Sequence, residues 1–314
     1  MSGTISEPSS EQAPDRGLWS TLVHYASLVR LSHTIFGLPF TLAAGILAHR
    51  AATTAGLGDG VGMTWLKLLW IVVAFTGART AAMGFNRIVD RDIDAKNPRT
   101  ASRELPAGKI DLRAAWALTI LAALVFVGAA AALGTVALAF SPLCLLIVGG
   151  YSLFKRFSWS AHLILGVALS LGPAGAWVAV TGGVQGFSLP AAMMVAVATW
   201  VSGFDVIYSL QDRDFDDGAG LHSIPVAFGV RGALWFSGVL HLLTTAALIA
   251  VHVLAGLGVA HLVGVVAVVA ILAYEHWIVR PDDLSRIDKA FFDLNGWISI
   301  AYFAAMLLDV LVLT

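Results

Sequence analysis

Nine stretches of this chain are apolar and long enough to cross a bilayer, and this feature constrains the fold more than any other. A helix rises about 1.5 Å per residue, so roughly 20 apolar residues cross a hydrocarbon core of about 30 Å. The chain is 58% hydrophobic and only 12% charged, which is too apolar for a soluble domain. We therefore predict an all-α integral membrane bundle whose partners include the lipid bilayer and no nucleic acid. The nine predicted transmembrane helices cover residues 32–49, 65–85, 113–133, 136–153, 161–181, 189–210, 232–254, 258–279 and 296–314.

Lys and Arg predict the orientation of the bundle. Of the 19 Lys and Arg residues, Arg50 and Lys67 fall in connections on one side and Arg79 within a span, whereas the others lie on the opposite side. Cytoplasmic loops carry such an excess, so we predict a cytoplasmic N-terminus and active side in the plasma (inner) membrane. Residues 1–17 are rich in Ser, Pro, Glu and Gln and lack an apolar core, which predicts a disordered cytoplasmic tail. Residues 18–314 are predicted to form one transmembrane domain.

The first candidate site follows the second span, in the sequence NRIVDRDID. Asn86, Asp90 and Asp94 recur every four residues, so on a helix they drift by only about 40° per step and form one oxygen-rich stripe. Two carboxylates and an amide oxygen suit Mg²⁺, which completes its coordination with water and substrate phosphate. This stripe predicts a Mg²⁺ site at the cytoplasmic end of the span.

A second acidic stripe ends the sixth span, in the sequence DVIYSLQDRDFDD. Asp205, Asp212 and Asp216 lie in near-helical register, and Asp205 sits in apolar sequence, where an unpaired carboxylate is costly. A plainer interpretation is a solvated loop whose acids pair with neighbouring Arg, and it suits the residues off the stripes, Asp92, Asp214 and Asp217. Two metal-binding stripes on one face would instead clamp a diphosphate between them.

A diphosphate also needs cationic partners, and four basic residues lie at the level of the two stripes. They are Arg30, Arg79, Lys155 and Arg156. Arg79 is the most informative, because a cation two turns inside the membrane requires an anionic partner. Arg87 and the other loop cations are explained by the cytoplasmic bias alone.

The two stripes give the chain its resemblance to the UbiA family of membrane prenyltransferases. That family carries NxxxDxxxD on one helix and DxxYxxxDxxxD on another, matched here by Asn86, Asp90 and Asp94 and by Asp205, Tyr208, Asp212 and Asp216. The likeness extends over most of the chain, including SHTIFGLPFTL, RTASRELPAG and YSLFKRFSW. The stretches around the motifs look like the 4-hydroxybenzoate polyprenyltransferase-like branch, which includes enzymes that prenylate 1,4-dihydroxy-6-naphthoate.

The resemblance implies nine helices around a central cavity that opens to the cytoplasm and laterally to lipid. The implied metal ligands for Mg²⁺ are Asn86, Asp90, Asp94, Asp205, Asp212 and Asp216, and the implied catalytic residues are Asp90, Asp94, Asp212 and Asp216. The implied diphosphate-binding residues are Arg30, Arg79, Lys155, Arg156 and Tyr208. We expect a Mg²⁺-dependent transfer of a polyprenyl group from polyprenyl diphosphate to a small aromatic acceptor.

The motifs indicate that one substrate carries a diphosphate, but they do not identify the acceptor, so several reactions are possible. The resemblance favours a quinone precursor such as 4-hydroxybenzoate, in ubiquinone or menaquinone biosynthesis, with 1,4-dihydroxy-6-naphthoate as an alternative. Haem, chlorophyll and archaeal-lipid prenyltransferases share the motifs. A secondary transporter is the alternative from another class, although the charges gather at one face rather than at the midplane. Prenyl length, oligomeric state and the group that takes the ring proton are left unassigned.

Overall fold

A computed structural model describes residues 18–30 and 34–313, and every regular element within these ranges is a helix. This confirms the all-α prediction, whereas the predicted tail, residues 1–17, lies outside the described residues. The first half comprises α1 (Leu18–Leu28), α2 (Thr34–Ala55), α3 (Trp65–Asp94), α4 (Leu112–Leu133), α5 (Thr135–Phe154) and α6 (Ala161–Thr181). The second half comprises α7 (Ser188–Ser209), η2 (Leu210–Asp212), α8 (Arg213–Gly218), α9 (Ile224–Ala255), α10 (Val259–Ile278), α11 (Ile287–Lys289), η3 (Ala290–Leu294), α12 (Asn295–Leu308) and η4 (Asp309–Leu313).

The helices agree closely with the predicted spans. Eight segments of the described chain are long and apolar enough to cross a membrane, and α2, with 22 residues, occupies the position of the remaining predicted span. The last crossing segment combines α11, η3, α12 and η4 over Ile287–Leu311. The protein is therefore an integral, multi-pass membrane protein. The boundaries differ at α3, predicted to end at residue 85 and continuing to Asp94, at α9, predicted from residue 232 and beginning at Ile224, and at the last crossing segment, predicted from residue 296 and beginning at Ile287.

The buried centre of the bundle is formed largely by α7. Its residues Val197, Trp200, Val201 and Phe204 are almost completely buried, because α7 packs between α6 and α9. On the periphery, by contrast, side chains such as Leu146 of α5 remain largely exposed. Large exposed apolar side chains are stable in lipid and costly in water, so this outer surface is the one that contacts the bilayer.

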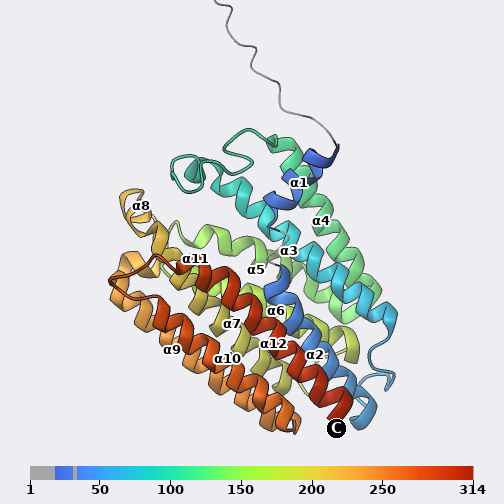
Figure 1. Ribbon diagram of the computed structural model, residues 1–314. Helices are drawn as coiled ribbons and strands as arrows, with labels where there is room; N and C mark the ends of the chain where they lie inside the picture. Colours follow the sequence, from blue (N-terminus) through green and yellow to red (C-terminus); the bar gives the residue numbers. More distant parts are fainter. Residues whose placement is uncertain (1–17, 31–33, 314) are drawn as a thin grey trace, which may run out of the picture.

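The longest connection and two short helices lie at one end of the bundle (Figure 1). Figure 1 shows α1, the connection between α3 and α4, and α8 at the same end, with the C-terminus at the opposite end. Two capped helices frame that connection. Asp111 caps α4 by accepting a hydrogen bond from the backbone amide of Ala114, whereas α3 continues to Asp94 before the chain turns. The connection is thus held between two fixed helix ends.

Candidate active site

The first acidic motif lies on one straight helical face of α3. Asp90 and Asp94 are buried, with only 2% and 4% of their surface exposed. Asn86 donates a hydrogen bond from Nδ2 to Asp90 Oδ2 at 3.1 Å. The four-residue spacing therefore produces the stripe that the sequence predicts.

Each carboxylate of the first motif contacts two basic side chains. Lys155 Nζ lies 2.7 Å and the Arg156 guanidinium 3.3 Å from Asp90. Arg103 donates to both oxygens of Asp94 at 2.7 and 2.8 Å, and Arg87 lies 3.9 Å from the same carboxylate. Such partners are required because a buried carboxylate without a cation or donor is very costly.

The second motif departs from the predicted continuous helix. Asp205 and Tyr208 lie on α7, but the α-helix ends at Ser209 and the 3₁₀ turn η2 carries Asp212. Asp216 then follows on the short helix α8. The tighter turn changes the direction of Asp212 relative to the ideal helical face, so the expected single stripe is interrupted at this point.

Asp212 is bound by the connection that follows α3. Asn97 Nδ2 and Arg99 Nε each donate to Asp212 Oδ1 at 2.8 Å, and a second Arg99 nitrogen contacts the other carboxylate oxygen. Arg99 also donates to the Tyr208 hydroxyl at 3.0 Å. Burial of Arg99 disfavours its charge, yet its hydrogen bond and Coulomb attraction to Asp212 outweigh burial and raise the pKa of Arg99. This guanidinium remains charged throughout the physiological range.

Asp205 faces the polar cavity and is paired with a histidine. Its Oδ2 lies 2.7 Å from Nδ1 of His162, at the start of α6. His162 is largely buried, and its other ring nitrogen, Nε2, has no hydrogen-bond partner within residues 23–30 and 34–311. A carboxylate on one nitrogen fixes the orientation of an imidazole and leaves the other nitrogen free.

The two motifs meet around one polar cavity of about 280 Å³. Arg156 does not line this cavity, but it contacts Asp90, which does. All the other residues predicted for the site line this cavity: Arg30, Arg79, Asn86, Asp90, Asp94, Lys155, Asp205, Tyr208, Asp212 and Asp216. Residues more than a hundred positions apart in the chain therefore form one site.

Three arginines of this cavity were not predicted from the sequence. Arg87, Arg99 and Arg103 line it and contact Asp94 or Asp212, although the orientation rule explained them as ordinary loop cations. Assigning them to the loop alone was wrong. The stretch RTASRELPAG contains Arg99 and Arg103. It was used only for the family resemblance, although it could have indicated that these two arginines belong to the site.

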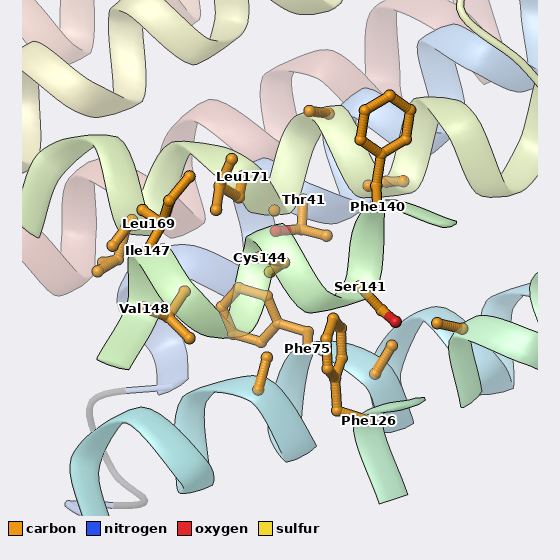
Figure 2. A pocket seen from close by; sticks show the side chains of 18 of the residues that line it. Thr41, Phe75, Phe126, Phe140, Ser141, Cys144, Ile147, Val148, Leu169 and Leu171 are labelled. Atoms are coloured by element: carbon orange, nitrogen blue, oxygen red, sulfur yellow. The ribbon is translucent and has the colours of Figure 1, made fainter. Parts of the chain in front are cut away.

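A second, apolar cavity of about 350 Å³ adjoins the polar one. Its walls come mainly from α3, α4, α5 and α6, and Figure 2 shows Phe75, Phe126, Ile147 and Leu169 among the side chains around it. The two cavities share lining residues where they meet, namely Arg79, Met83, Tyr151, Leu165 and Leu169. Phe140, on the wall of the apolar cavity, is half exposed on the outer surface. The site thus has a charged part and an apolar part that reaches the lipid-facing surface.

The carboxylates are not arranged around a preformed metal centre. Among the described residues, no three His, Cys, Asp or Glu side chains are close enough to hold one ion. Basic side chains hold Asp90, Asp94 and Asp212 instead. The oxygen donors are nevertheless of the type that a hard divalent cation prefers.

The two joined cavities, one charged and one apolar, suit an amphipathic substrate inside a membrane-spanning protein. A sequence model described as the UbiA prenyltransferase family matches residues 38–299. The chain belongs to this family and is therefore an integral membrane prenyltransferase.

Relatives of known name and solved structures agree with that assignment. A 4-hydroxybenzoate octaprenyltransferase from Nitrosospira multiformis is 30% identical, over 94% of this chain and 98% of the relative. The apo structure of a UbiA homologue from Aeropyrum pernix K1 superposes with a TM-score of 0.80 at 35% identity, covering 90% of this chain and 99% of that one. A UbiA homologue from Archaeoglobus fulgidus, solved with DMAPP and Mg²⁺, shares the fold with a TM-score of 0.68 at 20% identity, covering 92% of this chain and 99% of that one.

Proposed function

We propose that this protein transfers a polyprenyl group from polyprenyl diphosphate to a small aromatic quinone precursor such as 4-hydroxybenzoate. The observation that carries the proposal is the joining of the two cavities. A diphosphate fits the part lined by acidic and basic side chains, and an isoprenoid chain fits the adjoining apolar part. The named relative from Nitrosospira multiformis supports the choice of acceptor.

The acidic residues fit Mg²⁺ bound together with the diphosphate. We assign Mg²⁺ binding to Asn86, Asp90 and Asp94 from α3 on one side and to Asp212 and Asp216 from the second motif on the other, with the diphosphate between the two motifs, because all five supply hard oxygen donors to one cavity. The Archaeoglobus fulgidus homologue was solved with DMAPP and Mg²⁺, which supports a divalent ion beside a prenyl diphosphate, whereas the choice of residues rests on the oxygen donors of this cavity. When bound, the metal neutralises charge on the diphosphate and makes it a better leaving group.

Basic side chains would then bind the phosphate oxygens. Arg79 lies partly buried at the junction of the two cavities. Its guanidinium donates one hydrogen bond to the backbone oxygen of Arg30 at 3.4 Å, and its buried Nε has no hydrogen-bond partner in the described part of the chain. Lys155 and Arg30 face the polar cavity. Cations arranged in advance around a leaving diphosphate stabilise the charge that develops on it. Arg79, at the junction, would lie beside the first carbon of the isoprenoid chain.

The proposed transfer breaks one bond and forms another. The allylic C–O bond breaks, and its electron pair leaves with the diphosphate. A carbon of the electron-rich ring supplies a π-electron pair to the allylic carbon and forms the new C–C bond. The ring then loses the proton from that carbon and regains aromaticity. Water must be excluded from this step, which the buried apolar walls of the site accomplish.

We place the reaction at the cytoplasmic face of the plasma membrane, on the evidence of the Lys and Arg distribution. The acceptor alternative, 1,4-dihydroxy-6-naphthoate, has the same ring chemistry and requires the same site. Which acceptor is used is a matter of the shape of the polar cavity.

The test uses the full chain purified in detergent with Mg²⁺. Polyprenyl diphosphates of several lengths are supplied with 4-hydroxybenzoate or 1,4-dihydroxy-6-naphthoate, and prenylated product and diphosphate are measured. We expect product with at least one acceptor and one equivalent of diphosphate released per product. Failure to form product with any acceptor, together with solute uptake in liposomes, would overturn the proposal in favour of a transporter.

A further inference from the structure

The polar cavity has one wall without charged groups, built from aromatic rings of three separate elements. Phe36 of α2, Phe204 of α7 and Phe291 of η3 all line it and are almost completely buried. Their rings meet edge to face, with centroids 5.4 to 6.1 Å apart. Elements distant in sequence thus place three rings together, and we call Phe36, Phe204 and Phe291 the aromatic wall.

The aromatic wall adjoins the second acidic motif directly. Tyr208 of that motif stacks on Phe291, with ring centroids 4.0 Å apart and planes 27° from parallel. The Tyr208 hydroxyl accepts a hydrogen bond from Arg99, which also holds Asp212. A ring bound against the wall would therefore lie one side chain away from the proposed diphosphate site.

The wall is separate from the passage to the apolar cavity. The residues shared by the two cavities come from α3, α5 and α6, whereas the three rings come from α2, α7 and η3. An isoprenoid chain that enters the apolar cavity through the shared residues would not need to contact these three rings. The aromatic wall therefore lines a part of the polar cavity other than the proposed passage of the chain.

A buried asparagine fixes the position of Phe291. Asn295 is fully buried, and its Nδ2 donates to the backbone oxygens of Ala290 and Phe291 at 3.0 and 3.4 Å. Its Oδ1 accepts a hydrogen bond from Trp200 Nε1 at 2.7 Å. These bonds hold the π-helical turn η3 against α7. Short π-helical segments are often found at functional sites. The backbone at Phe291 is therefore held in place by a buried side chain.

We propose that the aromatic wall binds the flat ring of the acceptor and makes the site selective for aromatic acceptors. This inference rests on the proposed function and names the acceptor-binding surface within it. Edge-to-face and stacked contacts favour an aromatic ring over an aliphatic ring of similar size. The same ring faces would stabilise positive charge on the adjacent allylic carbon. Asn295 acts as a positioning residue for this surface.

The test compares Phe291→Leu, which removes the ring, with Phe291→Tyr, which retains it. The full-length variants are purified in detergent with Mg²⁺, and KM is measured for 4-hydroxybenzoate and for the polyprenyl diphosphate. We expect Phe291→Leu to raise the acceptor KM by about 3- to 10-fold and to leave the diphosphate KM within about twofold. Phe291→Tyr should restore the wild-type acceptor KM. An unchanged acceptor KM in Phe291→Leu would overturn the inference.

Two further measurements separate ring recognition from simple loss of packing. The first is competition by benzoate and by cyclohexanecarboxylate, whose inhibition constants should differ in the wild type and converge in Phe291→Leu. Equal inhibition by both in the wild type would count against an aromatic surface. The second is Phe126→Leu in the wall of the apolar cavity, which should change the diphosphate KM and not the acceptor KM. If the wild type forms no product, the proposed function fails, whereas an active wild type with no effect at Phe291 contradicts only this inference.

Discussion

Arg99 and Asp212, 113 residues apart in the sequence, form a two-point contact that joins the α3–α4 connection to the second acidic motif. The two side chains are partly buried, with 29% and 17% of their surface exposed. Arg99 also lies over the ring of Tyr208, 5.2 Å from its centroid. One guanidinium thus holds the carboxylate and the tyrosine of the motif in fixed positions.

The first prediction concerns this contact. We expect Arg99→Ala to lower kcat by about 100-fold, the usual cost of removing one preorganised electrostatic partner. Arg99→Lys should recover only part of the activity, because a lysine cannot reproduce the two-point geometry. Steady-state kinetics on both variants check this. Full activity in Arg99→Lys would show that charge alone matters here and that geometry does not.

The second prediction uses two neighbouring acids on α3 as a matched pair. Asp90 is buried and bound by Lys155, whereas the side chain of Asp92 is 81% exposed and contacts its neighbour Arg91. We expect Asp90→Asn to lower turnover by at least about 100-fold and Asp92→Asn to leave it unchanged. Product formation is measured with both variants, after their retention in the detergent-solubilised membrane fraction is confirmed. Equal effects of the two substitutions would contradict the assignment of the stripe.

The contrast between the two motifs shows what the sequence could and could not predict. The spacing of Asn86, Asp90 and Asp94 was sufficient to predict that they share one face, because α3 is a regular helix over that range and helical geometry depends on local spacing. The second motif was only partly predictable. Its 3₁₀ turn at Leu210–Asp212 has tertiary neighbours, Asn97 and Arg99, that no local pattern reveals.

The missed arginines have the same physical explanation. A loop cation that faces solvent and one that folds back onto a buried carboxylate have the same local sequence, and only the path of the connection distinguishes them. Arg103 reaches Asp94 because the chain turns after α3. The aromatic wall was equally unpredictable, since Phe36 and Phe291 come from opposite ends of the chain and meet only through the packing of α12 on α2.

The third prediction concerns the length of the isoprenoid chain. Gly175 lines the apolar cavity, and a Cβ atom added there would meet no atom within 4 Å. We expect Gly175→Phe to fill part of the cavity and to raise KM for long polyprenyl diphosphates by about tenfold, with little effect on short ones. The reason is that a phenylalanine side chain in the cavity would take up volume that a long isoprenoid chain needs and a short one does not.

The matched control for this prediction is Gly128→Phe. Gly128 also has open space around it but lies on the exposed face of α4, outside the cavity. KM measured over a series of chain lengths should match the wild type for this variant. A chain-length effect of equal size in both variants would mean that the apolar cavity is not the chain-binding site.

The fourth prediction distinguishes the roles of Asp205 and Asp212. Asp205 Oδ2 lies 2.7 Å from His162 Nδ1, so we assign Asp205 to orienting His162, whereas Asp212 belongs to the proposed metal set. Activity is measured as a function of Mg²⁺ concentration, after chelation with EDTA has abolished it. We expect Asp212→Asn to raise the Mg²⁺ concentration for half-maximal activity by about tenfold or more, because a charged metal ligand is lost.

For Asp205→Asn we expect lower kcat with the Mg²⁺ midpoint within about twofold of the wild type. The carboxylate would no longer fix the orientation of the imidazole, and ligand-orienting partners of this kind affect catalysis without contacting the reacting atoms. The effects of Asp205→Asn and His162→Gln on kcat should also be strongly non-additive, because both substitutions break one hydrogen bond. A Mg²⁺ midpoint that shifts as far in Asp205→Asn as in Asp212→Asn would instead return Asp205 to the metal-binding set implied by the sequence motif.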